Sequence, residues 1–377
     1  MESLVNVIMS FKNIYQDKKV FLTGHTGFKG SWLLTWLHLL GARVKGYSLP
    51  PAPEHKLYDQ IQGNSLCDSE FNDVLNYPAL EKSIVDFQPD FIFHLAAQAI
   101  VRTSYDDPTS TFNTNAIGTS NILNVVRKLA NPCVVVLVTT DKVYHNNEWP
   151  YPYRETDRLG GNDPYSASKA CAELIINSYR NSFFNSKTFQ QHKKSIVVAR
   201  AGNVIGGGDW AKDRIVPDIV RALQKSEAVI IRSPDSVRPW QHVLEPLHAY
   251  LILGEKLFDN TLCLSTEYNF GPLASDCWTV EKMVQFAITV WGGGSYQILK
   301  ETSGIKYEAQ LLTLDISRAG KELQWKPLLK AEEAIDKTIS WYKDFNGQNA
   351  YELIKKNIES FLQKYLDAIA PQTSFLK

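Results

Sequence analysis

The sequence predicts an α/β protein in which a doubly wound, mostly parallel sheet is followed by a smaller mixed lobe. Over the first 200 residues, short apolar runs alternate with helical patterns, which is the order that builds a parallel sheet with helices on both faces. After residue 200 the elements become shorter and the alternation ends. We therefore expect a tail at 1–17, a sheet domain at 18–204, and a second lobe at 205–377 with some segments returning to the first domain.

The first strand and helix are joined by a glycine-rich turn, GHTGFKG, at residues 24–30. In such a turn the first glycine permits a sharp bend, the second lets the backbone approach a pyrophosphate, and the third lets helix and strand pack closely. The helix N-terminus then offers free N–H groups to the phosphates. The turn predicts a dinucleotide site in a Rossmann-like domain. Its predicted cofactor-binding residues are Gly24, Thr26, Gly27, Phe28, Lys29 and Gly30.

The second strand, expected at Ala42–Tyr47, ends without the acid that binds the ribose in many NAD enzymes. No Arg follows to bind a 2′-phosphate, so the choice between NAD and NADP stays open, with NAD favoured. The polar stretch 51–70 predicts irregular structure, and Phe71–Val74 a possible short strand.

The remaining elements of the first domain follow from apolar patterns. The buried strand Asp90–Ala96 ends in small residues, Ala96 and Ala97, beside which a cofactor could pass. The other expected elements are a helix near 80–87, a helix at Thr111–Leu129, a strand at Cys133–Thr139, a helix at Pro164–Phe183 and a strand at Ser195–Arg200.

The second lobe is predicted from shorter signals. Gly206–Trp210 is expected to be a flexible loop capped by an aromatic residue, and the stretches 232–234 and 238–243 are expected to be polar turns. An amphipathic pattern over Leu328–Phe345 predicts a helix.

Composition excludes several functional classes. The 40 basic residues balance 40 acidic ones, so no affinity for nucleic acid or anionic membranes is expected. The chain lacks an apolar run of about 18 residues and the order of a signal peptide. Its five cysteines are scattered, which is typical of reduced thiols in a cytoplasmic protein. We expect no metal site, and structural, hydrogen-bonded roles for His25, His94 and His242.

Tyr165 and Lys169 lie four residues apart, on one face of the expected helix Pro164–Phe183. A free phenol has a pKa of about 10 and is a poor base at neutral pH. A cation one turn away and an oxidised nicotinamide favour the phenolate. The pair is therefore predicted to take a proton from a substrate hydroxyl as hydride leaves the same carbon. An ordinary helix with a solvated lysine is the alternative, which the glycine turn and the α/β pattern disfavour.

Several motifs extend this pattern into a resemblance. The chain is similar to the extended short-chain dehydrogenases/reductases and, within them, to the CDP-glucose 4,6-dehydratases, over roughly residues 18–345. The glycine turn and the Tyr-x-x-x-Lys pair mark only the superfamily. The other motifs that carry the resemblance are HLAAQ at 94–98, TDK at 140–142, AGNVIGGGDW at 201–210, RPWQHV at 238–243 and NFGP at 269–272.

The resemblance implies a redox-neutral reaction on tightly bound NAD. Hydride leaves C4 of the sugar, and the resulting ketone acidifies the C5 proton. Water is then eliminated across C5 and C6, and the hydride returns to C6. The product would be CDP-4-keto-6-deoxyglucose.

Elimination needs an acid near the C6 oxygen and a base near C5. Asp141 is assigned as the acid, which requires a desolvated site to keep its proton at neutral pH. Lys142 is the base, or else it orients a water or stabilises the 4-enolate, and Thr140 hydrogen-bonds the C4 hydroxyl. Since adjacent strand residues face opposite ways, Asp141 and Lys142 reach one sugar only if the strand has ended at Thr140.

Further binding positions come from the same resemblance. Two arginines suit a diphosphate, because planar guanidinium groups donate paired hydrogen bonds. The positions are Asp73 and Val74 for the adenine, Asn203, Arg214 and Arg238 for the sugar nucleotide, and Asp209 and Trp240 for the ribose or base. For the last two, packing within the lobe is the alternative.

Three other functional interpretations remain open. A nucleotide-sugar 4-epimerase also oxidises C4, but it needs no acid–base pair for elimination, so Asp141 and Lys142 argue against it. A dehydratase acting on another nucleotide hexose differs only in base preference. An inactive regulatory relative would often lose the tyrosine or the lysine, and both are present. The family resemblance also implies a homodimer or higher homo-oligomer formed through helices beside Tyr165.

Overall fold

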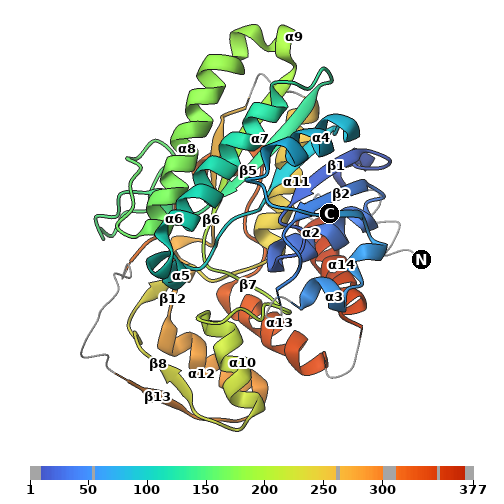
Figure 1. The fold of residues 1–377 in the computed structure, drawn as a ribbon. Helices are drawn as coiled ribbons and strands as arrows, with labels where there is room; N and C mark the ends of the chain where they lie inside the picture. Colours follow the sequence, from blue (N-terminus) through green and yellow to red (C-terminus); the bar gives the residue numbers. More distant parts are fainter. Residues whose placement is uncertain (1–9, 53–55, 260–263, 300–310, 346–348, 370–377) are drawn as a thin grey trace, which may run out of the picture.

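The computed structural model describes residues 10–52, 56–259, 264–299, 311–345 and 349–369. A seven-stranded parallel sheet forms its centre (Figure 1). The chain winds in one direction from the first strand and in the other from the fourth, which creates a crevice at the carboxyl ends of these two neighbours. In spatial order the strands are β11 (Glu267–Phe270), β6 (Lys194–Ala201), β5 (Cys133–Thr139), β4 (Phe91–His94), β1 (Lys19–Thr23), β2 (Arg43–Ser48) and β3 (Asp68–Phe71).

The sheet separates two hydrophobic cores, because successive strand residues face opposite sides. In β1, Val20 and Leu22 belong to one core and Phe21 to the other. The core containing Phe21 is covered by α4 (Tyr77–Phe87), α7 (Gly118–Val126) and α8 (Pro164–Phe183).

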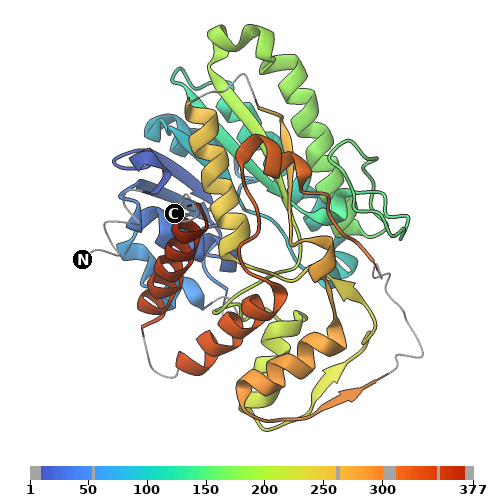
Figure 2. The ribbon, with the colours of Figure 1, turned by 180° about the vertical axis from the view of Figure 1, so that it is seen from behind.

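The opposite face of the sheet carries α2 (Phe28–Leu39), α11 (Leu244–Asp259) and α14 (Ala350–Ile369), and Figure 2 shows α11 and α14 on this side. The segment before β1 is part of the same core: Phe11 and Tyr15 are buried, and the Tyr15 hydroxyl donates a hydrogen bond of 2.6 Å to the Leu251 carbonyl. The described part of the predicted tail therefore packs against the domain.

The second lobe lies beyond the carboxyl ends of the strands (Figure 1). Its helices are α10 (Ile215–Gln224), α12 (Val280–Trp291) and α13 (Ala331–Asp344), and α13 confirms the amphipathic pattern. The described residues of the lobe also form three two-stranded sheets: β7 (Val204–Ile205) with β10 (Gln241–His242), β9 (Val237–Arg238) with β12 (Trp278–Thr279), and β8 (Val229–Ile231) with β13 (Tyr296–Ile298).

The structure corrects several sequence-based predictions. The stretch 51–70 is not irregular throughout, since it holds α3 (Leu57–Gln60), a 3₁₀ turn at Gly63–Ser65 and most of β3. The short strand expected at Phe71–Val74 ends at Phe71, which leaves Asp73 and Val74 in the turn that follows. The polar turn expected at 238–243 contains β10 and the end of β9.

The helix expected at Thr111–Leu129 is not continuous: it comprises the end of α6 (Pro108–Phe112), a π-helical turn, η3 (Asn113–Ile117), and α7, which ends at Val126. A further short helix, α5 (Val101–Asp106), precedes α6. In η3 the Asn115 amide donates to the Gln98 carbonyl and its oxygen accepts from the Gln98 N–H, both at 3.0 Å. These two hydrogen bonds attach the π-helical turn to the loop that follows β4.

The loop Gly206–Trp210 is buried rather than loosely exposed, with only Trp210 partly accessible. The Trp32 indole donates 2.9 Å to the Gly207 carbonyl, and the Tyr342 hydroxyl donates 2.6 Å to the Asp209 carbonyl. These bonds attach the loop to α2 and α13.

None of the helices in the described ranges combines the length and apolar character needed to cross a bilayer. Cys67, Cys133, Cys171 and Cys277 are free thiols, and Cys263 lies outside the described residues. Within the same ranges, no group of three His, Cys, Asp or Glu side chains is arranged to hold a metal ion.

Candidate active site

A single cavity of about 2210 Å³ lies between the carboxyl ends of the strands and the second lobe. It exceeds the usual size of a site for one small molecule, about 300–1,000 Å³, and has room for two extended ligands. All sequence-predicted site residues line it: Gly24, Thr26, Gly27, Phe28, Lys29, Gly30, Asp73, Val74, Ala96, Ala97, Thr140, Asp141, Lys142, Tyr165, Lys169, Asn203, Asp209, Arg214, Arg238 and Trp240.

The glycine turn forms the dinucleotide end of the cavity. Gly24 has a φ of 73°, and a Cβ there would lie 2.7 Å from the Ala96 nitrogen. A Cβ on Gly30 would lie 2.0 Å from the Gly24 carbonyl oxygen, so helix α2 can approach the turn only because Gly30 has no side chain. At Gly27, the N-cap of α2, the nearest atom to such a Cβ is 3.4 Å away. The turn therefore has the shape of a pyrophosphate cradle.

The end of β2 forms the wall where a nucleotide ribose would lie. The Thr26 and Ser48 hydroxyls share a 2.6 Å hydrogen bond, and Thr26 also donates to the Leu49 carbonyl at 3.1 Å. The Asp73 carboxylate accepts the Leu75 N–H at 2.9 Å. Hydroxyls and one carboxylate thus line the cavity near the end of β2, where the sequence has no strand-end acid.

Tyr165 and Lys169 project from the buried first turns of α8, which starts with Pro164 after the N-cap Asp163. The Tyr165 N–H donates to the Ser104 hydroxyl at 3.2 Å, and the Lys169 ammonium donates to the Val138 carbonyl at 3.2 Å. Burial raises the pKa of Tyr165 to about 12, partly offset by Thr140 and Arg214. Burial lowers the pKa of Lys169 to about 8, partly offset by Glu173.

The segment Thr140–Lys142 lies beyond the end of strand β5, as it must if Asp141 and Lys142 are to reach the same sugar. Strand β5 ends at Thr139, and Thr140 caps the 3₁₀ turn η4 (Asp141–Val143). The Thr140 hydroxyl donates to Asp141 Oδ1 at 2.9 Å. Asp141 is 2% exposed and lies over Gly202, where a Cβ would be 2.1 Å from the Asp141 Cγ. Asp141 is thus desolvated, and half-buried Lys142 lines the same cavity.

Lys29, from the glycine turn, is buried close enough to several charged cavity residues to be affected by them. Its ammonium lies 3.5 Å from the Tyr250 hydroxyl. Burial, together with the charges of Arg214 and Lys169, lowers its pKa to about 7, and Asp141 opposes that shift. The structure therefore joins the glycine turn and the Tyr–Lys pair in one electrostatic cluster.

In the second lobe, the predicted substrate residues Asp209, Arg214 and Trp240 form hydrogen bonds with other groups of the lobe. Arg214 bonds Asp209 at 2.9 Å, and the other Asp209 oxygen accepts the Ala211 N–H at 3.2 Å. The Trp240 indole donates to the Trp278 carbonyl at 3.2 Å and its side chain is buried. Asp209 and Trp240 therefore line the cavity and also make contacts within the lobe, and Asp209 orients Arg214.

Two cavity residues carry no signal in the sequence. Arg102 on α5 and Asp213 before α10 form an ion pair of 3.5 Å between the sheet domain and the lobe. Neither belongs to a motif, and their proximity depends on the fold.

Comparison with known proteins agrees with this geometry. The profile of the family described as GDP-mannose 4,6 dehydratase matches residues 21–338. The CDP-glucose 4,6-dehydratase of Salmonella typhimurium is 44% identical over 352 residues, which cover 93% of this chain and 98% of that protein. The chain belongs to the family of nucleotide-sugar dehydratases and epimerases. This confirms the resemblance to extended short-chain dehydrogenases/reductases that the motifs predicted.

More distant members of the family share the fold. The dTDP-glucose 4,6-dehydratase of Salmonella typhimurium is 24% identical over 86% of this chain and 92% of its own length. The solved dTDP-glucose 4,6-dehydratase of Bacillus anthracis, in complex with NAD, superposes with a TM-score of 0.72 at 21% identity, covering 89% of this chain and 99% of that chain. The UDP-glucose 4-epimerase of Thermotoga maritima gives 0.72 at 20% identity, covering 87% and 99%.

Proposed function

We propose that the protein is a hydro-lyase that converts CDP-glucose to CDP-4-keto-6-deoxyglucose and water with tightly bound NAD. The observation that carries this proposal is the 44% identity to a CDP-glucose 4,6-dehydratase over 98% of that protein. The cavity supports it, since Asp141 and Lys142 share one space with Tyr165 and Lys169.

The cofactor would lie along the glycine turn, with its adenine near Asp73 and Val74 and its backbone passing Ala96 and Ala97. When bound, NAD supplies the hydride acceptor that starts the cycle and the hydride donor that ends it. The wall formed by Ser48, Leu49, Pro50 and Ala52 offers no cation to a 2′-phosphate, and Asp73 adds negative charge. These groups favour NAD over NADP.

In the oxidation step, Tyr165 takes the proton of the C4 hydroxyl while Thr140 holds that hydroxyl. The raised pKa of Tyr165, about 12, means that the phenolate needs nearby positive charge. Lys169 one turn away and Arg214 across the cavity supply it. Because C4 stays a ketone in the product, this proton is not returned to the sugar; its transfer from Tyr165 to Asp141, directly or through water, restores both groups for the next cycle.

In the elimination step, Asp141 donates a proton to the departing C6 hydroxyl, and Lys142 takes the C5 proton or stabilises the enolate. Asp141 is buried beside the Thr140 hydroxyl, whereas half-buried Lys142 lies at the cavity wall. Asn203, Arg214 and Arg238 would bind the sugar nucleotide. Residues 18–204 would thus hold mainly the cofactor, and 205–377 mainly the substrate.

We also propose a homo-oligomer, because Ile117 beside α7 and Leu174 on α8 are 49% and 60% exposed on the helices next to the site. Light scattering of the purified protein tests this, and a mass equal to one chain would contradict it.

The functional test is incubation with NAD and equal concentrations of CDP-, dTDP-, UDP- or GDP-glucose, followed by NMR of the products. We expect a 4-keto-6-deoxy sugar from CDP-glucose, no net reduction of NAD, and a kcat/KM highest for the cytidine substrate. A C4 epimer as the only product, or preference for another base, would contradict the proposal.

A further inference from the structure

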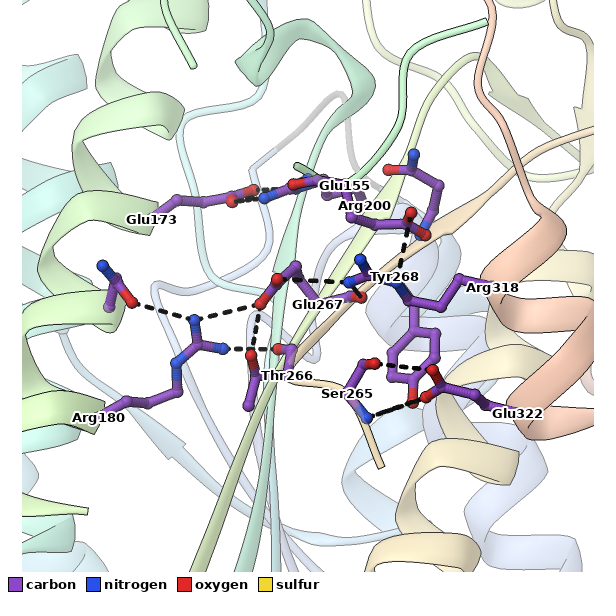
Figure 3. Close-up of polar contacts among 12 residues, drawn as sticks. Glu155, Glu173, Arg180, Arg200, Ser265, Thr266, Glu267, Tyr268, Arg318 and Glu322 are labelled. Carbon is purple, nitrogen blue, oxygen red and sulfur yellow. Dashed lines mark hydrogen bonds and ion pairs between the residues drawn. The ribbon is translucent and has the colours of Figure 1, made fainter. Parts of the chain in front are cut away.

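Behind the reaction centre, a buried ion pair joins helix α8 to strand β6. The side chains of Glu173 and Arg200 are only 3% and 4% exposed. The Arg200 Nε donates to both carboxylate oxygens, at 2.9 and 3.0 Å, and its Nη2 bonds the same group (Figure 3). Glu173 follows Lys169 by one helical turn, so the pair is anchored directly beside the predicted oxidation residues.

The Glu173 carboxylate also reaches the end of β5. Its Oε1 accepts the Thr139 hydroxyl at 2.6 Å. Thr139 is the last residue of the strand and directly precedes Thr140, Asp141 and Lys142. The carboxylate therefore ties the helix that carries Tyr165 to the start of the segment that carries Asp141.

The Arg200 guanidinium bonds Tyr144, which lies at the other end of the segment that carries Asp141. Its Nη1 donates to the Tyr144 hydroxyl at 2.6 Å and to the Glu155 carbonyl at 3.0 Å. Tyr144 directly follows turn η4, and its hydroxyl donates to Asn269 Oδ1 at 2.7 Å. Thus Thr139 and Tyr144, on either side of residues 140–143, are both bonded to one ion pair.

A second layer of charges backs this arrangement (Figure 3). The Asn269 N–H donates to Glu155 at 3.0 Å, and Arg318 lies 3.6 Å from the same carboxylate. Arg318 and Arg180 both pair with Glu267, at 3.4 and 3.2 Å. The ion pair is therefore part of a continuous network between α8, β6 and β11, which limits its freedom to move.

We propose that Glu173 and Arg200 are positioning residues that hold Asp141 and Lys142 in register with Tyr165 and Lys169, so that elimination follows oxidation without release of the keto sugar. The inference rests on the proposed function. Burying two charges is costly, and an apolar pair of similar volume often stabilises a fold as well, so stability alone does not account for the arrangement. Displacing a reacting group by about 1 Å can cost about a hundredfold in rate, which gives the register its importance.

The test removes the two hydroxyls that link the ion pair to residues 140–143. The double variant Thr139→Val/Tyr144→Phe keeps side-chain shape and leaves every proposed catalytic group in place. The matched control is Thr338→Val/Tyr15→Phe, which deletes two buried hydroxyl hydrogen bonds of 2.6 Å that involve neither the ion pair nor residues 139–144. Each enzyme, loaded with NAD, is mixed rapidly with CDP-glucose, and the absorbance of the reduced nicotinamide is followed together with product formation.

In the test variant we expect the oxidation rate to stay within about threefold of wild type while overall turnover falls about tenfold or more. Reduced cofactor should then accumulate, and exchange of the C5 proton with solvent deuterium should slow with turnover. The control should show neither change. A test variant that matches the wild-type transient, or that loses oxidation and elimination equally, would overturn the inference. A wild-type enzyme that neither reduces NAD nor makes a keto sugar would instead overturn the proposed function.

Discussion

Helices α8 and α11 lie on opposite faces of the same sheet. Each carries a buried glutamate, Glu173 on α8 and Glu245 on α11, and the two carboxyl groups have different bonding partners. Glu173 on α8 is paired with Arg200 inside a network of charges. Glu245 on α11 accepts the Leu328 and Leu329 N–H groups at 2.8 and 2.7 Å, and its second oxygen has no partner among the described residues. Burial raises the pKa of Glu245 to about 8.

The side chains one turn from each glutamate differ in the same way, being neutral near Glu245 and charged near Glu173. On α11, His248 is enclosed by aromatic rings, including a stacked Trp36, and burial lowers its pKa to about 3. On α8, Lys169 keeps a carboxylate one turn away. The surroundings of Glu173 thus include fixed charges, whereas the hydrogen-bond partners of Glu245 are neutral groups. Fixed charges suit the face that carries the reaction centre, where groups must act without rearrangement.

The largest expected effect comes from removing the phenol on the charged face. Tyr165→Phe should lower the rate of sugar oxidation about 10³-fold, because proton transfer by a positioned group contributes about 10²–10⁴-fold. Binding of CDP-glucose should change little. Tyr179→Phe is the matched control, since it removes another α8 hydroxyl, one bonded to Ser120 at 3.2 Å. Single-turnover reduction of NAD measures both, and an equal loss in the control would contradict the assignment.

Asp141→Asn should act later in the cycle. We expect turnover to fall about 10²-fold, with oxidation preserved and reduced cofactor accumulating, since the departing hydroxyl loses its acid. Product NMR and the nicotinamide absorbance report the two steps separately. Full turnover by this variant would exclude Asp141 as the acid.

Stability provides the next contrast between the two faces. Glu173→Gln leaves Arg200 charged and unpaired in the interior, so the free energy of unfolding should fall by about 3–5 kcal/mol. Replacing both residues with methionine should recover part of that loss. Urea denaturation measures it, and a change below about 1 kcal/mol for Glu173→Gln would show that the pair is not buried in solution.

Unlike Glu173→Gln, Glu245→Gln should not lower the free energy of unfolding at neutral pH. The difference in stability between this variant and the wild type should depend on pH. The pKa of Glu245 is raised from 4.5 to about 8 on folding, so protonation favours the folded state and stability is lost as pH rises through this window. Relative to Glu245→Gln, the wild type should lose about 3 kcal/mol of stability between pH 5 and 7, at about 1.4 kcal/mol per unit. Parallel pH profiles of the two proteins would contradict a neutral Glu245.

Elements of both faces also differ in how well they could be predicted from the sequence. Strand β5 and helix α8 match their expected bounds, because a continuous apolar run and a Pro-started helix are local signals. The cavity residues could be gathered correctly, since the carboxyl ends of parallel strands share one edge of the sheet. Strand β11 was not predicted, because its pairing with β6 joins residues about 70 apart in the chain.

Glu173 and Arg200 could not be predicted for a related reason. A single acid in a helix and a single arginine near the end of a strand have no periodicity, and solvated surface positions look the same. Only the packing of α8 against β5 and β6 brings them together. The break of the expected helix 111–129 at a π-helical turn likewise depends on the tertiary contacts of Asn115.

The most direct measurement follows one hydride through the reaction. CDP-glucose labelled with deuterium at C4 is converted by the NAD-loaded enzyme in ordinary water, and the product is read by NMR. We expect deuterium at C6 of a 4-keto-6-deoxy sugar and no net change in the cofactor. Deuterium that remains at C4, or that ends on released NADH, would contradict a dehydratase in which Tyr165 and Asp141 act on the same bound sugar.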